Sequence, residues 1–228
     1  MPELRIFYDL LSQPSRAVVL FLEGNKIPYE SVVISLTEGA HIKNEDLGKV
    51  NPRRTIPAMD DNGFYLSESG AILRYLVAKC KVPDHWYPSK PEDRARIDEY
   101  LEWNDSNIRA GAMGFFYYKF ARPKVFGLPA DVAKAEEGKE KLEKAIATFE
   151  NYFLSRGKFI GGDDISIADL KPLCELTQIS MTDYKPYQDG SKVDVWMKNC
   201  KERLGPAYDK AHQFVSDAIE QGLFKSNN

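Results

Sequence analysis

The chain has 228 residues, of which 43% are hydrophobic and 29% charged, and its net charge at pH 7 is −3. This composition is typical of a globular protein with an ordinary core, and the length allows one large or two modest domains. The slight negative charge offers no basic surface, so we expect neither nucleic acid nor a membrane as a partner. No run of 18 apolar residues occurs, and the first residues lack the pattern of a secretory signal.

The cysteines and histidines are few and widely separated. There are three of each, namely Cys80, Cys174, Cys200, His41, His85 and His212. No C-x-x-C motif occurs, which argues against a dithiol oxidoreductase and against a zinc site. We therefore expect no metal, and we expect the reducing environment of the cytoplasm.

The first 80 residues alternate strand-like and helix-like patterns. Residues 4–8 and 29–36 predict two strands, and the apolar stretch 15–23 between them predicts a helix that has Pro14 in its first turn. A hairpin is predicted where residues 57–59 and 64–66 flank a turn that contains Asn62-Gly63. Ser67 is then placed to cap a helix. This order predicts a small α/β domain over residues 1–80.

Residues 81–91 contain three prolines and are interpreted as a linker. Beyond them the apolar residues recur at helical spacing, first along residues 97–112, then along 142–153, and again around 167–179, 193–203 and 207–219. We therefore predict an all-helical domain over residues 92–228.

Ser166 and Asp169 have the spacing of a helix capping box, with Ile165 and Leu170 placed as a hydrophobic staple. This pattern is interpreted as structural, so these residues are left out of the candidate site.

Five stretches of the chain carry a resemblance to a known family. They are residues 10–18 (LLSQPSRAV), 51–58 (NPRRTIPA), 66–69 (LSES), 82–101 and 159–170. Together and in this order they resemble theta-class glutathione transferases over nearly the whole chain. The resemblance implies a thioredoxin-like N-terminal domain with a mixed four-stranded sheet, and an all-α C-terminal domain that contributes the electrophile pocket.

The same resemblance implies an activity. Enzymes of this family conjugate glutathione to hydrophobic electrophiles such as alkyl or aryl halides and epoxides, and some also reduce peroxides. Glutathione is then a co-substrate and no other cofactor is expected, and the enzyme is expected to be a homodimer. A rival interpretation is a non-catalytic binding module of the same fold, which the presence of Ser12, Glu68 and Ser69 disfavours.

Ser12 is the predicted catalytic residue. A lone serine before a helix is ordinarily a cap, but if Pro14 is the first helical residue, Gln13 becomes the cap and Ser12 lies just outside. Its hydroxyl could then donate to an anion near the positive helix end. Tyr8 and Ser15 are rival hydroxyls; Tyr8 ends a strand, and Ser15 falls inside the first helical turn.

This chemistry has a definite energetic requirement. A free thiol with a pKa of about 8.5 is only about 3% thiolate at pH 7, and the thiolate is the nucleophile. Lowering that pKa by about two units requires about 2.7 kcal/mol in favour of the anion. One charge-assisted hydrogen bond together with a helix dipole has this magnitude, so no general base on the protein is needed.

The resemblance also implies which residues bind glutathione, namely His41, Thr55, Ile56, Glu68 and Ser69. Ser69 and its N–H would bind the γ-glutamyl carboxylate, and Glu68 the ammonium group. A cis peptide bond is expected at Pro57, so that the Ile56 backbone faces the cysteinyl residue. Thr55 stands where the family often has lysine. On the residues alone, His41 would be a solvated loop residue and Glu68 a partner of the helix dipole.

The electrophile pocket is less well defined by the sequence. Arg109, Met113, Phe116 and Tyr117 are candidates for it, although an aromatic cluster of this kind belongs by default to the core.

Overall fold

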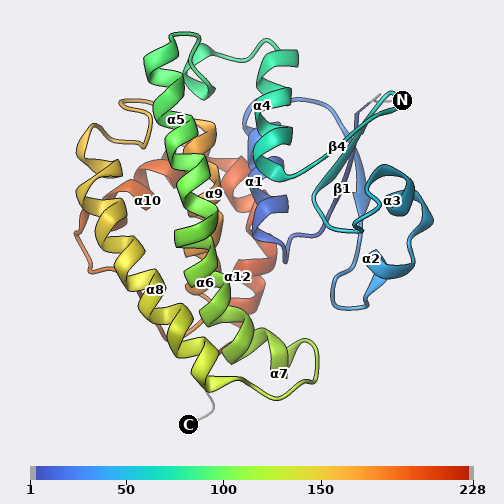
Figure 1. The fold of residues 1–228 in the computed structure, drawn as a ribbon, viewed down its shortest axis with the longest axis vertical. Helices are drawn as coiled ribbons and strands as arrows, with labels where there is room; N and C mark the ends of the chain where they lie inside the picture. The colour runs from blue at the N-terminus through green and yellow to red at the C-terminus, as the bar shows by residue number, and fades with distance from the viewer. Residues whose placement is uncertain (1–3, 226–228) are drawn as a thin grey trace. The chain divides into compact units, whose positions relative to one another are not determined.

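The computed structural model describes residues 4–225 and contains one four-stranded sheet in its N-terminal part (Figure 1). The strands are β1 (Leu4–Tyr8), β2 (Glu30–Val33), β3 (Ala58–Asp61) and β4 (Phe64–Ser67), in the order β2-β1-β3-β4. β1 runs parallel to β2 and antiparallel to β3, which is antiparallel to β4. The mixed four-stranded sheet and the hairpin are therefore confirmed. Asn62 and Gly63 form the turn with φ values of 51° and 86°.

Four helices accompany the sheet, namely α1 (Gln13–Gly24), α2 (Ala40–Lys43), α3 (Glu45–Val50) and α4 (Ser69–Lys79). α1 is buried without interruption from Ser15 to Leu22, as its apolar sequence requires, and it contacts α4. The predicted first residue is wrong, because α1 begins at Gln13 and places Pro14 at the second position.

The chain divides into two compact units, and the first contains a segment from the far end of the sequence. Besides the residues up to Pro83, it includes Leu204–Gln213. Here α11 (Pro206–Ala211) packs on α1, and Lys210 Nζ lies 2.7 Å from the carboxylate of Glu23. The helical domain was predicted over residues 92–228, whereas Leu204–Gln213 belongs to the first unit. The single helix predicted over residues 207–219 is also broken, into α11 and α12 (Gln213–Glu220).

The second unit is helical. Its helices are η1 (Asp84–Trp86), α5 (Pro91–Asn104), η2 (Asp105–Arg109), α6 (Ala110–Phe116), η3 (Tyr117–Ala121), α7 (Arg122–Lys124), α8 (Val132–Asn151), η4 (Phe153–Ser155), α9 (Ile167–Ile179) and α10 (Lys192–Leu204), together with most of α12. α5 to α7 follow one another without a break, and η2 and η3 are π-helical turns within them. Figure 1 shows α5 and α6 as a long green helix with α8, in yellow, beside it.

Glycines allow α6 and α8 to approach closely. A Cβ atom at Gly138 of α8 would lie 2.4 Å from the backbone nitrogen of Phe115, and one at Gly111 of α6 would lie 2.6 Å from that of Leu142. Neither position can accept a larger side chain unless the helices separate.

The capping box before α9 is confirmed. Ser166 is the N-cap and exchanges hydrogen bonds with Asp169, whose carboxylate also accepts from Trp196 Nε1 at 2.8 Å and from the Ile160 N–H at 2.9 Å. Burial raises the pKa of the Asp169 carboxyl above its usual value, while these hydrogen bonds oppose the rise. Asp169 therefore joins α9, α10 and the preceding loop, which is a structural role.

Within residues 4–225 no helix is both long and apolar enough to cross a membrane. The same residues contain no group of three or more histidine, cysteine, aspartate or glutamate side chains arranged to hold a metal ion.

Candidate functional site

The pairing of the strands brings four separate stretches of sequence to one edge of the sheet. Phe7, near the end of β1, pairs with Ala58 at the start of β3, and Ala58 pairs with Ser67 at the end of β4. Tyr8 pairs with Val33 at the end of β2. The loops that leave β1, β2 and β4 and the loop that enters β3 therefore meet at this edge. Ligands of open α/β sheets bind at the corresponding position.

Ser12 lies in the loop that leaves β1, and it is the N-cap of α1. Its Oγ accepts a long hydrogen bond, 3.4 Å, from the Ser15 N–H, and its own N–H donates to the carbonyl of Asp9 at 3.0 Å. The prediction that Gln13 is the cap is therefore wrong. A hydroxyl can accept through a lone pair and still donate its own hydrogen. Capping thus leaves the Ser12 proton available to a ligand at the positive end of the helix.

Two residues that sequence reasoning missed hold this loop in place. The carboxylate of Asp9 accepts from the Leu11 N–H and from the Leu36 N–H, each at 2.8 Å, and so joins the loops after β1 and β2. Arg16 is fully buried, and its Nη1 donates to the carbonyl of Leu10 at 2.6 Å. The signal for Arg16 was present in the sequence, since an arginine inside an apolar helical stretch needs buried acceptors.

The two rival hydroxyls have other surroundings. Tyr8 OH accepts a hydrogen bond of 2.8 Å from Ser31 Oγ of β2. Ser15 is fully buried in the first turn of α1, and its Oγ has no hydrogen-bond partner among the described residues. Neither occupies the cap position that Ser12 has.

The loop that enters β3 has the predicted backbone geometry. The Ile56–Pro57 peptide bond is cis, which confirms that expectation. Asn51, which is 2% exposed, donates from Nδ2 to both the carbonyl (2.8 Å) and the hydroxyl (2.9 Å) of Thr55. Ile56 packs against the core cluster that contains Phe7 and Val50. The loop before Pro57 is therefore held by the hydrogen bonds of Asn51 to Thr55 and by the packing of Ile56 on the core.

The start of α4 differs from the prediction in one respect. The N-cap is Glu68 and not Ser67, and Ser69 is the first helical residue. Glu68 has a φ of 72° and makes no side-chain cap hydrogen bond. Its carboxylate lies 2.9 Å from Nη2 of Arg53, which also donates to Ser67 Oγ at 2.7 Å. A non-glycine residue with positive φ is uncommon, and such residues cluster at functional sites.

His41 is part of α2, the short helix beyond β2. It follows Gly39, whose φ is 66°. Its Nδ1 is buried and has no hydrogen-bond partner among the described residues. A buried nitrogen of this kind requires an explanation, and a ligand is one.

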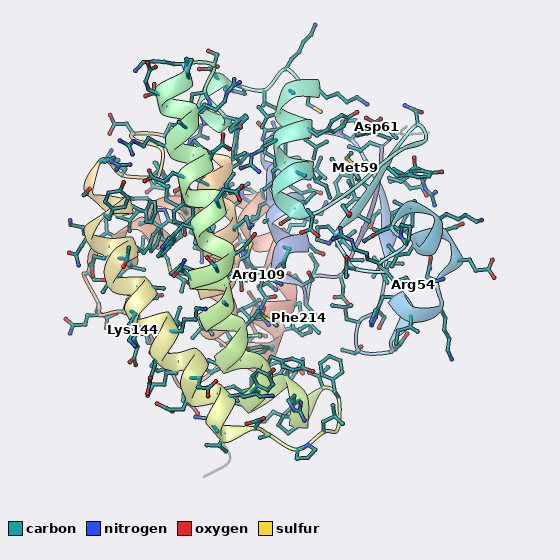
Figure 2. The ribbon with its side chains drawn as sticks, in the orientation of Figure 1. Arg54, Met59, Asp61, Arg109, Lys144 and Phe214 are labelled. Atoms are coloured by element: carbon teal, nitrogen blue, oxygen red, sulfur yellow. The ribbon has the colours of Figure 1, made fainter. Side chains whose placement is uncertain are left out.

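Asp61, which Figure 2 labels, anchors α4 to the hairpin that precedes it. Its carboxylate accepts from Tyr75 OH at 2.5 Å and from Lys79 Nζ, both on α4. Burial alone would raise the pKa of Asp61, but the hydrogen bonds from Lys79 and Tyr75, with the charge of Lys79, hold it below its ordinary value. The Asp61 carboxylate therefore joins the C-terminal half of α4, the helix that begins at Ser69, to the end of β3.

The four residues predicted for the electrophile pocket belong to the second unit. Arg109, which Figure 2 labels on the long green helix, lies 2.5 Å from the buried carboxylate of Glu175. Phe116 is 2% exposed and its ring packs against those of Phe120 and Phe224, so it is a core residue. Two further candidates, Met113 and Tyr117, are partly exposed.

Comparison with known proteins gives consistent matches along the chain. Residues 12–80 match the glutathione S-transferase N-terminal domain, and residues 111–203 match the glutathione S-transferase C-terminal domain. The chain is 34% identical to human glutathione S-transferase theta-1 over 216 residues, which cover 94% of this chain and 90% of that protein. It is 36% identical to glutathione S-transferase T1 of Arabidopsis thaliana, with 99% and 94% covered.

A solved structure agrees with the sequence comparisons. The structure of a human theta-class glutathione transferase in complex with the glutathione conjugate of 1-menaphthyl sulfate is similar to this fold with a TM-score of 0.88. That chain is 34% identical, and the match covers 98% of this chain and 93% of that one. By sequence, domain order and fold, the chain belongs to the theta class of the glutathione S-transferase family.

Proposed function

We propose that this transferase conjugates the thiolate of glutathione to hydrophobic electrophiles such as alkyl halides, aryl halides and epoxides, and that Ser12 activates the thiol. One observation carries the proposal. Ser12 caps α1 at the sheet edge where the loops after β1, β2 and β4 and the loop before β3 meet, and its cap bond leaves its proton free to donate.

In the proposed reaction the thiol proton passes to solvent and the thiolate accepts a hydrogen bond from Ser12. The hydrogen bond and the N-terminus of α1 favour the anion over the neutral thiol, which lowers the pKa of the thiol. The sulfur then attacks an electrophilic carbon and forms a C–S bond. A halide leaves with its electron pair, or an epoxide ring opens and its oxygen takes a proton from water.

The tripeptide is proposed to lie along the same sheet edge. Glu68 takes the γ-glutamyl ammonium group, and Ser69 with its N–H takes the γ-glutamyl carboxylate. The Ile56 backbone pairs with the cysteinyl residue, with Thr55 beside it. His41 takes the glycine carboxylate, which would supply its buried Nδ1 or its other ring nitrogen with a partner.

The electrophile is proposed to contact Arg109, Met113 and Tyr117, with Phe116 behind them in the core. The similar human theta-class structure is a complex with the glutathione conjugate of 1-menaphthyl sulfate, which supports a hydrophobic electrophile for this chain as well. The same thiolate would reduce a hydroperoxide to an alcohol; the glutathione sulfenic acid formed then reacts with a second glutathione to give the disulfide and water. We also propose a homodimer that acts in the cytoplasm.

Turnover measurements test the proposal directly. The purified protein is incubated with glutathione and, in turn, an alkyl halide, an epoxide, an aryl halide and a hydroperoxide, and the conjugate or disulfide is quantified. We expect turnover with at least one electrophile and a large loss in Ser12→Ala. Glutathione binding without turnover would support the rival interpretation, a non-catalytic binding module. An absence of binding would overturn both.

A further inference from the structure

We propose that Arg53 binds the α-carboxylate of the γ-glutamyl residue, so that Arg53 and Glu68 together receive the two charges of this zwitterionic group. The inference rests on the proposed binding of glutathione. It assigns a ligand to a residue that neither the sequence motifs nor the proposed function places in the site.

The contacts of Arg53 place its guanidinium at the start of α4. Nη2 lies 2.7 Å from Ser67 Oγ and 2.9 Å from Glu68 Oε1. Ser67 and Glu68 are the last two residues before Ser69, the first residue of the helix. The guanidinium therefore lies beside the helix N-terminus where the γ-glutamyl carboxylate is proposed to bind.

The ion pair between Arg53 and Glu68 is open to solvent. The side chains of Arg53 and Glu68 are 60% and 67% exposed. Such a pair contributes little to folding, because water screens its charges. A ligand can therefore enter between the two groups without the large cost of breaking a buried ion pair.

Glu68 is turned away from its own helix. As the N-cap of α4 it makes no side-chain cap hydrogen bond, and its carboxylate instead faces Arg53. The backbone N–H groups at the start of α4 thus receive no cap from Glu68 and can bind an anion. A carboxylate placed there would be within reach of Arg53, whose planar guanidinium suits two parallel hydrogen bonds to a carboxylate.

The neighbouring residues do not supply this cation. Arg54 is committed to α3 and the turn before it, since its Nη1 donates to the carbonyl of Asn44 at 2.9 Å and its guanidinium lies against Gly48. Thr55 carries no charge, and its hydroxyl is held by Asn51. Arg53 is therefore the member of this loop whose charge faces the start of α4.

Two glutathione analogues separate the two charges of the ligand. In 4-aminobutyryl-cysteinylglycine the α-carboxylate is missing and the amino group is kept. In glutaryl-cysteinylglycine the amino group is missing and the carboxylate is kept. Calorimetric dissociation constants are measured for glutathione and both analogues with the wild type, Arg53→Gln, Glu68→Gln and the control Lys49→Gln. Lys49 is an exposed lysine of α3 that pairs with Asp46.

We expect Arg53→Gln to weaken glutathione binding about tenfold. This is the effect of losing one hydrogen bond between charged groups, reduced because the site is exposed to solvent. Arg53→Gln should leave the affinity for the 4-aminobutyryl analogue unchanged, because the group that Arg53 binds is already absent. Glu68→Gln should likewise weaken glutathione binding but leave the affinity for the glutaryl analogue unchanged, because that analogue lacks the amino group that Glu68 binds. Lys49→Gln should change none of the affinities, which excludes a general effect of positive charge.

Two outcomes overturn the inference alone. In the first, Arg53→Gln lowers the affinity for the 4-aminobutyryl analogue as much as it lowers the affinity for glutathione. In the second, Arg53→Gln leaves the affinity for glutathione unchanged, while Arg74→Gln lowers that affinity. Arg74 is a second arginine, in α4, and its guanidinium lies near Gly70. If the wild type binds no glutathione, the proposed function itself fails, so the two failures can be told apart. Thermal unfolding of Arg53→Gln and Arg53→Lys checks that both variants are folded.

Discussion

The guanidinium of Arg109 lies 2.5 Å from the carboxylate of Glu175, and four residues earlier on each helix Lys171 Nζ lies 2.6 Å from the carboxylate of Asp105. Asp105 and Arg109 are the first and last residues of the π-helical turn η2, and both of their partners are on α9. The charges alternate along each helix. A shift of one helix past the other by a turn would bring like charges together, so the pairs fix the register of η2 against α9.

The first prediction concerns this pair. Arg109→Leu should destabilise the protein by about 3 kcal/mol, because it removes the cation from a carboxylate that is 2% exposed. The double variant Arg109→Leu with Glu175→Leu should cost less than the sum of the single changes. Urea unfolding measures both. The exposed pair Lys49–Asp46 is the control, and its removal should cost less than about 1 kcal/mol. Additive single effects would contradict the coupling.

The second prediction separates the two roles of Ser12. Ser12→Ala loses both the cap and the donor, so it should cost about 1 kcal/mol of stability and return the pKa of the bound thiol toward about 8.5. Ser12→Asp keeps a capping acceptor and should preserve stability. However, its negative charge should raise the thiol pKa further. Thiolate absorbance of the glutathione complexes, titrated against pH, gives the pKa. Identical titrations in all three proteins would assign activation to another donor, such as Tyr8 or a water molecule.

The third prediction concerns the start of α4. Glu68→Ala and Ser69→Ala should each weaken glutathione binding by about 1.5–3 kcal/mol, the range for a hydrogen bond to a charged group. Glu68 makes no side-chain cap bond, so its removal should scarcely alter the unfolding transition. Calorimetry and thermal unfolding together test this. Unchanged affinity in both variants would remove these residues from the site.

The fourth prediction is a dependence on pH. The pKa of Asp61 is lowered in the folded state, so its charge adds stability above its unfolded pKa of about 3.9, and this stability is lost as the pH falls through the lower folded value. Asn cannot titrate, so Asp61→Asn should show a shallower loss of unfolding free energy between about pH 5 and pH 2. Urea unfolding at several pH values measures the slopes. Parallel curves would show that Asp61 does not contribute.

The fifth prediction tests the crossing of α6 and α8. Gly138→Ala should be strongly destabilising, because its Cβ would lie 2.4 Å from the backbone of Phe115. Gly70→Ala is the matched control within a helix, since the atom nearest to its Cβ is 3.6 Å away on a flexible arginine. It should be neutral or stabilising by up to about 1 kcal/mol. Equal effects of the two changes on the unfolding free energy would contradict the role of the close approach.

Features that depend on neighbouring residues could be predicted from the sequence. The Asn62-Gly63 turn and the Ser166–Asp169 capping box are set by the conformations and hydrogen bonds of residues within a few positions of each other. The α/β fold of the N-terminal part could be predicted from the order of such local patterns along the chain. The cis bond before Pro57 needed the resemblance as well, because an X–Pro bond is trans by default.

Features that depend on distant contacts or on a small shift of a helix start could not be predicted in this way. Pro14 is compatible with the first or the second helical position, so it did not decide whether Ser12 or Gln13 is the cap. Likewise the pair of Arg53 and Glu68 joins two exposed side chains from different loops, and no periodicity marks it. The π-turn η2 was also missed, because apolar spacing over residues 97–112 hardly distinguishes a π-turn from an α-turn.

The placement of α11 against α1 has a consequence for how the protein is made. The strands and helices before Pro83 leave the ribosome before α11 does, yet the unit to which they belong also includes Leu204–Gln213. Until about 120 further residues have been synthesised, the surface of α1 that α11 covers has no partner from that segment. A fragment that ends near residue 83 therefore lacks a segment of this unit, and the residues up to Pro83 reach their final packing only after Leu204–Gln213 has emerged.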